Sequence, residues 1–299
     1  MSSSNAGSRP VEAGGSRWVD PGHLYVVATP IGNLADISAR AQSVLEGVDF
    51  IACEDTRHAR VLLDHLGVRK ECVALHEHNE RGASEAIARR LAAGQSAALI
   101  SDAGTPAISD PGEVLVRVLV DGGVPVVPVP GASAVIAALS ASGLPARPFW
   151  FEGFLPAQDK ARRDRLDRLA GVEATLAFYE APHRIVKCVA VAADRLGGDR
   201  RAVLARELTK RFEQVVHGTL MELAGRLTEG TIPARGEFVF LVAPAGGSAE
   251  PPAAEAEALI AAMIDEGVAP KTIARVVSRT TSLSRNAIYA EVLARRKEP

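Results

Sequence analysis

The residues best able to do chemistry lie in polar segments that follow short apolar runs. In the twelve-residue segment Ser101–Gly112, Asp102 and Asp110 can bind hydroxyl or cationic groups, and Gly104 permits close backbone approach to a ligand. The prolines of this segment stiffen it. The alternative interpretation is a plain turn followed by a helix that starts at Asp110-Pro111. A plain turn, however, needs fewer special residues than this segment contains. We therefore expect the segment to bind a ligand.

Two further polar segments end apolar runs. Glu54-Asp55-Thr56-Arg57 enters a helix, and its two acids beside an arginine can orient a hydroxyl or manage a proton. An acidic helix cap, which the helix dipole favours, is an equally good interpretation. In the segment 206–211, Arg206 and Glu207 emerge at a strand end. The alternative there is a surface salt-bridge cluster of small energetic effect.

Several sequence patterns of known chemistry are missing. The chain contains no GxGxxG, no GxxxxGK[ST] and no GxSxG, so dinucleotide binding, a phosphate-gripping loop and serine hydrolysis have no support. His76-Glu77-His78 has no partner cluster at metal-ligand spacing, so we expect a polar loop and no metal. The three cysteines lie far apart, which fits a reducing compartment.

Composition narrows the class of protein. The 299 residues are 47% hydrophobic, and 34 Lys+Arg stand against 36 Asp+Glu, for a net charge of -2. This length predicts two globular domains with a small third piece. The balance of charges excludes attraction of nucleic acid by net positive charge, so any affinity for nucleic acid must come from local patches. Aromatic residues make up only 4%, which argues against base-stacking platforms. No apolar run reaches the roughly 18 residues of a membrane helix, so we expect a cytoplasmic protein without membrane contact.

In the first half, continuously apolar runs alternate with helical stretches, which predicts an α/β fold with a mostly parallel sheet. The expected strands are residues 24–28, 50–52, 72–75, 97–100 and 124–129. The expected helices between and after them are residues 38–45, 56–66, 83–93, 113–120 and 132–142. Ligands of such folds lie beyond the carboxyl ends of the strands, so the loops 29–33, 101–106 and 128–133 are the expected binding loops.

The second half mixes strands and helices in a way that predicts some antiparallel pairing. Its expected strands are 149–152, 175–179, 202–205, 212–217 and 238–242, and its expected helices 160–169, 183–196 and 220–227. The expected division is a disordered tail (1–22), an N-terminal α/β domain (23–146), a C-terminal α/β domain (147–243), a linker (244–254) and a helical appendage (255–299).

The appendage resembles a helix-turn-helix, with expected helices at 255–265, 271–279 and 284–295. The Ser284 hydroxyl can cap the last helix. Residues 271–297 carry seven Lys or Arg against one acid, Glu291. Such a local cluster of cations is typical of ionic contact with phosphates.

A longer series of blocks resembles one family. They are Tyr25–Ile37, Glu54–His58, Ser101–Gly112, Pro128–Ser133, Glu152–Pro156, Phe178–Arg184 and Ala205–Lys210. Together they are similar to the ribosomal RNA small subunit methyltransferase I family of the tetrapyrrole-methylase superfamily. The resemblance covers about residues 24–297 and implies a two-domain tetrapyrrole-methylase-like α/β fold with the helix-turn-helix-like appendage.

The resemblance also implies an activity and its cofactor. The enzyme would use S-adenosyl-L-methionine (S-adenosylmethionine) to methylate the ribose 2′-hydroxyl of a cytidine in the decoding centre of 16S ribosomal RNA, within the small ribosomal subunit. It would act as a homodimer and hold the methyl donor in a cleft between its domains. The implied donor-binding residues are Pro30, Asp102, Gly104, Thr105, Ile108, Ser109, Ala132, Ser133, Tyr179, Ala205 and Glu237. The implied RNA-binding residues are Lys210, Lys271, Arg275, Arg279 and Arg285.

Methyl transfer to a hydroxyl is an in-line displacement. The donor supplies a reactive methyl group, and the protein aligns the oxygen, carbon and sulfur atoms. A ribose hydroxyl needs a basic or hydrogen-bonding group beside it. The expected catalytic carboxylates are Glu54, Asp55 and Glu207, and the cations expected to steady charge beside them are Arg57, Arg206 and Lys210. We expect Arg206-Glu207 and the loop Thr29–Asn33 to flank the target nucleotide, because both are polar strand-end segments.

The residues alone are also compatible with two other functions. A precorrin-type tetrapyrrole C-methyltransferase would share the donor loops but has no need of a basic appendage. A helix-turn-helix regulator that senses a ligand would bind duplex DNA without turnover. A dinucleotide oxidoreductase is disfavoured because its fingerprint is missing.

Overall fold

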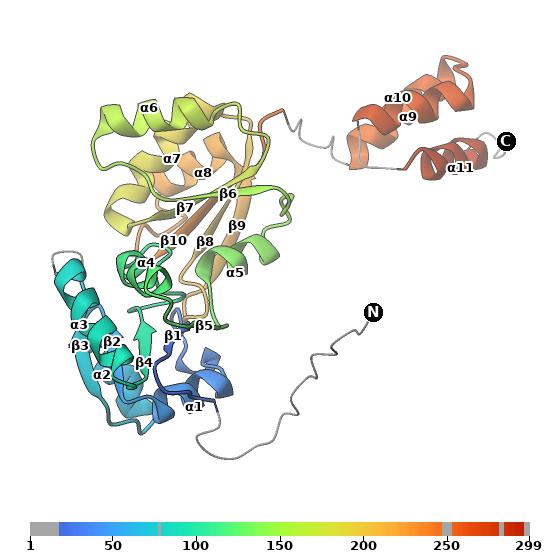
Figure 1. The fold of residues 1–299 in the computed structure, drawn as a ribbon. Helices are drawn as coiled ribbons and strands as arrows, with labels where there is room; N and C mark the ends of the chain where they lie inside the picture. Colours follow the sequence, from blue (N-terminus) through green and yellow to red (C-terminus); the bar gives the residue numbers. More distant parts are fainter. Residues whose placement is uncertain (1–17, 77–78, 247–252, 281–283, 296–299) are drawn as a thin grey trace, which may run out of the picture. The chain divides into compact units, whose positions relative to one another are not determined.

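The computed structural model describes residues 18–76, 79–246, 253–280 and 284–295, with only the backbone described at 253–256 and 279–280. The described residues form two compact units (Figure 1). One comprises the described parts of Met1–Ala137 together with Glu207–Glu213, and the other comprises Ala138–Arg206 and the described parts of Gln214–Pro299. Most of the expected tail (1–22) and linker (244–254) lies outside the described residues, and both stay predictions.

The first unit contains a five-stranded sheet in the order β3-β2-β4-β1-β5, and every pairing in it is parallel, as predicted. Its strands are β1 (Leu24–Val27), β2 (Phe50–Cys53), β3 (Glu71–Ala74), β4 (Ala97–Ile100) and β5 (Val126–Val129). Its helices are η1 (Leu34–Asp36), α1 (Ala39–Gly47), α2 (Thr56–His65), α3 (Glu80–Ala92), α4 (Glu113–Asp121) and α5 (Ala134–Ala141), whose last residues belong to the second unit.

Helices cover both faces of this sheet, which explains why its strands are apolar at successive positions. On one face, Ile51 of β2 packs with Val44 of α1 and Leu63 of α2. On the other, Phe50 of the same strand packs with Ile87 of α3 and Leu115 of α4. Neighbouring residues of one strand therefore enter two different cores.

The second unit contains a mixed sheet in the order β6-β7-β10-β8-β9, in which β6 and β7 run parallel and the other pairs antiparallel. Its strands are β6 (Phe149–Phe154), β7 (Thr175–Glu180), β8 (Arg201–Arg206), β9 (Gln214–Thr219) and β10 (Phe238–Val242). The helices α6 (Asp159–Leu169), α7 (Pro182–Leu196) and α8 (Leu220–Thr228) bury one face of this sheet.

The antiparallel pairing was predicted, but the start of one strand was not. The expected strand 212–217 begins at Gln214, because Phe212 lies in the segment 207–213 that belongs to the first unit. The side chain that made this position strand-like in the sequence is largely exposed, and apolar character alone does not separate an exposed loop residue from a strand residue.

The three C-terminal helices share a small apolar core of their own. They are α9 (Ala253–Asp265), α10 (Pro270–Thr280) and α11 (Arg285–Arg295), and their buried contacts include Ile260, Ile273 and Ile288. The hydroxyl of Ser284 accepts a hydrogen bond from the Ala287 amide at 3.1 Å, which confirms the predicted cap. Among the described residues, no helix is long and apolar enough to cross a membrane.

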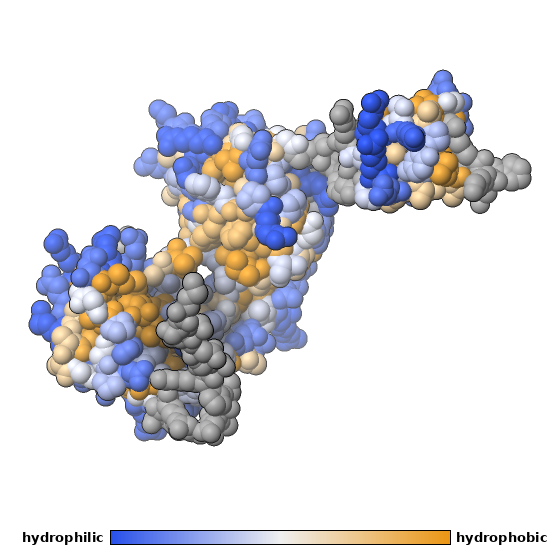
Figure 2. Space-filling view, turned by 45° about the vertical axis from the view of Figure 1, so that its right-hand side comes forward, coloured by the Kyte–Doolittle hydropathy of each residue, from blue (hydrophilic) through white to orange (hydrophobic). Residues whose placement is uncertain are grey.

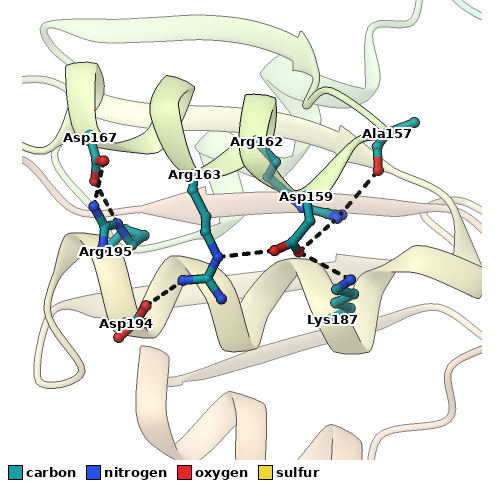
Figure 3. A network of polar contacts seen from close by, with 8 residues as sticks. All are labelled: Ala157, Asp159, Arg162, Arg163, Asp167, Lys187, Asp194 and Arg195. Atoms are coloured by element: carbon teal, nitrogen blue, oxygen red, sulfur yellow. Dashed lines mark hydrogen bonds and ion pairs between the residues drawn. The ribbon is translucent and has the colours of Figure 1, made fainter.

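The surface between α6 and α7 is held by a network of ion pairs (Figure 3). The Asp159 carboxylate contacts Arg163 Nε and Lys187 Nζ, each at 3.1 Å, and Arg163 also donates to Asp194 at 2.7 Å. Arg195 of α7 pairs with Asp167 of α6 in the same way. Helix α6 is rich in arginine, but the neighbouring acids neutralise much of its charge. We therefore do not expect this surface to attract anions strongly.

The contribution of this network to stability depends on pH. Hydrogen bonds from Lys187 and Arg163 lower the pKa of Asp159 in the folded state. The stabilisation is therefore present above the unfolded value of about 3.9 and is lost as pH falls through the folded-state pKa. Asp159→Asn should lower the urea midpoint modestly at pH 7, and the difference from wild type should shrink below about pH 4.

The matched control is Asp164→Asn, a change at an exposed acid on the same helix. Its urea midpoint at pH 7 should stay close to that of wild type. Equal effects of the two substitutions would show that the network adds nothing beyond general surface charge.

Candidate functional site

Three loops meet at the carboxyl edge of the first sheet, after the adjacent strands β4, β1 and β5. The backbones of Thr29 and Gly104 exchange two hydrogen bonds, of 2.8 and 3.1 Å, in an isolated antiparallel bridge. The Thr29 hydroxyl donates to the Ser101 carbonyl at 3.1 Å, and the Thr105 hydroxyl donates to the Ala132 carbonyl at 3.2 Å. These contacts connect the loops 29–33, 101–112 and 130–133, which we call the laced loops.

Local backbone geometry explains the small residues in the laced loops. Gly104 has φ +82°, which favours glycine, and a Cβ added at Gly131 would lie 2.9 Å from the Cβ of Ala28. Ala107 holds φ +64° although it is not glycine. Such a backbone conformation is strained and persists where the surroundings enforce it, often at ligand sites.

The structure brings the predicted donor-binding residues of the first unit together on these loops. Asp102, Ile108 and Ser109 are exposed, and an exposed isoleucine on a rigid loop suits contact with an apolar ligand surface. The others are less accessible: Thr105, Ala132 and Ser133 are half-buried, and Pro30 and Gly104 are buried.

Glu80, which the sequence analysis did not identify, supports the longest of the laced loops. Glu80, the first residue of α3, accepts hydrogen bonds from the amides of Gly112 and Val114 at 2.8 and 3.2 Å. It thereby caps the start of α4 from another helix. Inside the loop, burial raises the pKa of Asp110, and the charge of Asp102 adds to that rise.

The Glu54–Arg57 segment lies at the end of β2, next to β4. Asp55 is the N-cap of α2, since its carboxylate accepts from the Arg57 amide at 2.8 Å and from the Arg57 guanidinium at 2.9 Å. These hydrogen bonds lower the pKa of Asp55 to about 2. Of the two interpretations, the geometry favours the cap for Asp55, because so weak a base takes up a proton poorly.

One turn further along α2, His58 faces the laced loops. Its Nδ1 lies 3.4 Å from a carboxylate oxygen of Asp102. The sequence placed His58 in a family block but gave it no role. The pairing depends on β2 and β4 being neighbours, which no local pattern reveals.

Glu207 and Lys210 lie in the short segment 207–213 of the first unit. Their side chains form an ion pair of 3.0 Å and are both mostly buried. Glu207 and Thr209 hold φ values of +51° and +65°, so this turn is strained as well. A Cβ added at Gly32 would collide with the Lys210 side chain. The Lys210 side chain therefore lies against the loop Thr29–Asn33, while the expectation that Arg206-Glu207 and this loop flank the target nucleotide stays a prediction.

Arg206, the last residue of β8, is buried. Its Nε donates to the Arg235 carbonyl at 2.6 Å and its Nη1 to Gln214 Oε1 at 3.3 Å. These contacts tie the end of β8 to the chain before β10 and to the start of β9. They give Arg206 a structural role in addition to any contact with substrate.

The predicted donor-binding residues of the second unit lie at one end of its sheet. Val239 of β10 is paired with Tyr179 on one side and with Ala205 on the other, and the exposed Glu237 lies two residues before it. This places Tyr179 and Ala205 on the face opposite the helices that bury Phe178 and Leu204, with Glu237 just before β10 at the same end of the sheet.

Buried charges fix the strand end beside Tyr179. The fully buried Glu180 forms an ion pair of 3.0 Å with Arg184 and accepts a hydrogen bond from the Ala181 amide at 2.9 Å. Arg184 donates in turn to the carbonyl of Leu155. The block Phe178–Arg184, which appeared in the sequence as part of the resemblance, therefore holds β7, α7 and the chain after β6 together.

The appendage carries three exposed cations in described positions, Lys271, Arg275 and Arg285. The side chain of Arg279 lies outside the described residues, and so do Glu77 and His78 of the histidine pair considered above. Across the residues that the structure describes, no three His, Cys, Asp or Glu side chains form a group suited to a metal ion.

Comparison with known proteins first defines the class. Residues 23–224 match the family model of the Tetrapyrrole (Corrin/Porphyrin) Methylases. The fold is shared with the native uroporphyrin III C-methyl transferase from Thermus thermophilus, at 22% identity and a TM-score of 0.52, over 74% of this chain and 97% of that one. Diphthine synthase has a TM-score of 0.56 at 18% identity, over 75% and 90%. The chain has the tetrapyrrole-methylase fold, which confirms the predicted fold class.

Relatives named ribosomal RNA small subunit methyltransferase I then define the family. The protein of Xylella fastidiosa (strain Temecula1) is 50% identical over 90% of this chain and 98% of its own length. Those of Pseudomonas aeruginosa and Escherichia coli O157:H7 are 48% and 44% identical, over 98% and 95% of their lengths. This chain belongs to the ribosomal RNA small subunit methyltransferase I family, as the resemblance predicted.

Proposed function

We propose that this protein transfers the methyl group of S-adenosylmethionine to the ribose 2′-hydroxyl of a cytidine in the decoding centre of 16S ribosomal RNA. The observation that carries the proposal is the 44–50% identity, over nearly their whole length, to relatives named for methylation of small-subunit ribosomal RNA. This similarity favours RNA over a tetrapyrrole carbon as the acceptor, because the solved tetrapyrrole enzymes share the fold at much lower identity.

The laced loops fit the methyl donor. The Asp102 carboxylate matches a cationic sulfonium, and the exposed Ile108 can cover an apolar ring. The donor supplies the activated methyl group when bound, and the protein orients it and excludes water. Tyr179, Ala205 and Glu237 are our candidates for donor contacts from the second unit, supported by their common place at one end of its sheet.

Hydroxyl and phosphate groups of the RNA would contact two polar segments near the laced loops, Glu54–Arg57 and Arg206–Lys210. Glu54 and Glu207 are our candidates for the carboxylates that orient the ribose hydroxyl, while Asp55 and Arg57 fix the start of α2 through the cap hydrogen bonds. Lys210, fixed by Glu207 and by the loop around Gly32, would meet a phosphate as a preorganised cation. Arg206 would support this segment from β8.

The direct test is mass mapping of the product. Small subunits and free 16S RNA from a strain lacking this enzyme would be incubated with labelled S-adenosylmethionine, digested and analysed. We expect one cytidine to gain one methyl group on its ribose. A methyl group on a base, or none on either RNA substrate, would contradict the proposal.

The appendage is proposed to hold RNA through phosphate contacts. Lys271, Arg275 and Arg285 are exposed on helices α10 and α11, and Figure 2 shows strongly hydrophilic side chains on this part of the chain. Arg279 is a further candidate from the sequence. Ionic contacts of this kind release counterions and carry no base specificity.

Salt dependence tests this assignment. Replacing Lys271, Arg275 and Arg285 by alanine should weaken RNA binding and reduce the slope of log affinity against log salt by about 0.7–0.9 per lost contact. The control is Arg295→Ala, since Arg295 is already paired with Glu291 at 2.6 Å and should contribute little. An unchanged slope in the triple variant would contradict phosphate contact.

We also propose that the enzyme is a cytoplasmic homodimer that meets its RNA in the small ribosomal subunit. Strand β6 is an edge strand with three exposed aromatic side chains, Phe149, Trp150 and Phe154, and Figure 2 shows a hydrophobic area on this unit. Such an edge invites pairing unless it is covered, and a second copy would cover it symmetrically.

Sedimentation measurements test the dimer. The wild-type protein should sediment at twice the mass of one chain, and Trp150→Lys should shift it towards monomer. Val120→Lys, a change at another exposed apolar residue, should leave the mass unchanged. A wild-type monomer at micromolar concentration would contradict this proposal.

A further inference from the structure

His58 has no part in the function proposed so far, and it lies beside Asp102 at the carboxyl edge of the first sheet. His58 Nδ1 lies 3.4 Å from Asp102 Oδ2, and the His58 side chain is 66% exposed against 34% for Asp102. The pair joins the start of α2 to the laced loops. It therefore stands where the proposed donor site adjoins the segment Glu54–Arg57.

Both members of the pair are held by the sheet beneath them. Cys53, at the end of β2, is in register with Ile100, at the end of β4, so the residues that follow these strands are neighbours. Asp102 is fixed because its loop is bonded to Thr29 on both sides, at Ser101 and at Gly104. The helix that carries His58 is fixed by the Asp55 cap.

This geometry favours one position for the imidazole proton. A carboxylate facing Nδ1 favours a proton on that nitrogen, which leaves Nε2 as the acceptor. A separation of 3.4 Å is longer than a hydrogen bond, but catalytic contacts commonly tighten when substrate binds. A histidine oriented by an aspartate is the usual arrangement for taking a proton from a hydroxyl.

We propose that His58 is the general base for the ribose 2′-hydroxyl and that Asp102 is the residue that positions it. The inference rests on the proposed function. The 2′-oxygen forms a bond to the methyl carbon as the bond from that carbon to sulfur breaks, and the bonding electrons stay on sulfur. The hydroxyl proton moves to His58 Nε2 and from there to solvent. S-adenosylhomocysteine and the methylated ribose leave.

Three other groups near the site are poorer proton acceptors. Asp55 is bonded to Arg57 and has a pKa of about 2, and Glu207 is paired with Lys210. Burial raises the pKa of the Cys53 thiol to about 12, so it stays protonated. An unprotonated imidazole, in contrast, can take up a proton and release it again, which suits a general base.

The charged groups around His58 determine how its test is designed. Asp102 faces it from the loop after β4, with Asp110 further along that loop, and Asp55 and Arg57 flank it on α2. None of these is altered in the decisive variants, His58→Gln and His58→Ala. The matched control is His65→Gln, a change at an exposed histidine at the far end of the same helix.

Single-turnover methylation of the RNA substrate would be measured from pH 5.5 to 9, with donor and RNA affinities measured separately by calorimetry and anisotropy. The His58 variants should lose about 100-fold or more in rate and lose the fall in rate at acidic pH, while both affinities stay within about twofold. Added imidazole should raise the rate of His58→Ala. His65→Gln should match wild type throughout.

A wild-type rate and pH profile in His58→Gln would overturn the inference, as would a loss of rate explained wholly by weaker donor or RNA binding. Failure of imidazole to raise the rate of His58→Ala would also count against it. These results are distinct from failure of the proposed function, in which the wild-type enzyme itself would place no methyl group on a ribose.

Discussion

The architecture of the site depends on the short bridge between Thr29 and Gly104. Through it the loops after β1 and β4 become one rigid surface, and the Thr105 hydroxyl extends that surface to the loop after β5. The backbone groups of Thr29 and Gly104 form hydrogen bonds with each other and not with water. The loops are therefore ordered although they contain no helix or strand. Asp102 is anchored by this bridge, because it lies between Ser101 and Gly104, whose carbonyls both accept hydrogen bonds from Thr29.

A rigid surface of this kind suits methyl transfer. The donor brings a reactive carbon, so the protein contributes alignment and a place for one proton, and alignment can supply about 7–11 kcal/mol of the barrier. Strained backbone at Ala107 and Glu207 follows the same principle, because the surroundings hold these residues in conformations that a free loop would leave. The pair of His58 and Asp102 adds an oriented base to this frame.

Much of the fold could be predicted because its signals are local. Apolar runs located the strands, and the Ser284 hydroxyl marked a helix start. The strand beginning at Gln214 was misplaced because Phe212 is apolar yet exposed in a loop. The roles of Glu80 and His58 were missed because their partners come from other elements, and strand order is not written in any local pattern. Asp55 looked equally fit for capping and catalysis until its hydrogen bonds were seen.

The most direct test of the account is hydrogen exchange of the full-length protein with and without S-adenosylhomocysteine, under conditions in which calorimetry shows saturation. The account predicts added protection of amides in the laced loops, above all in 101–109 and 130–134, with little change in α3 or α8. Saturation with protection elsewhere and none in these loops would contradict the claim that they form the donor site.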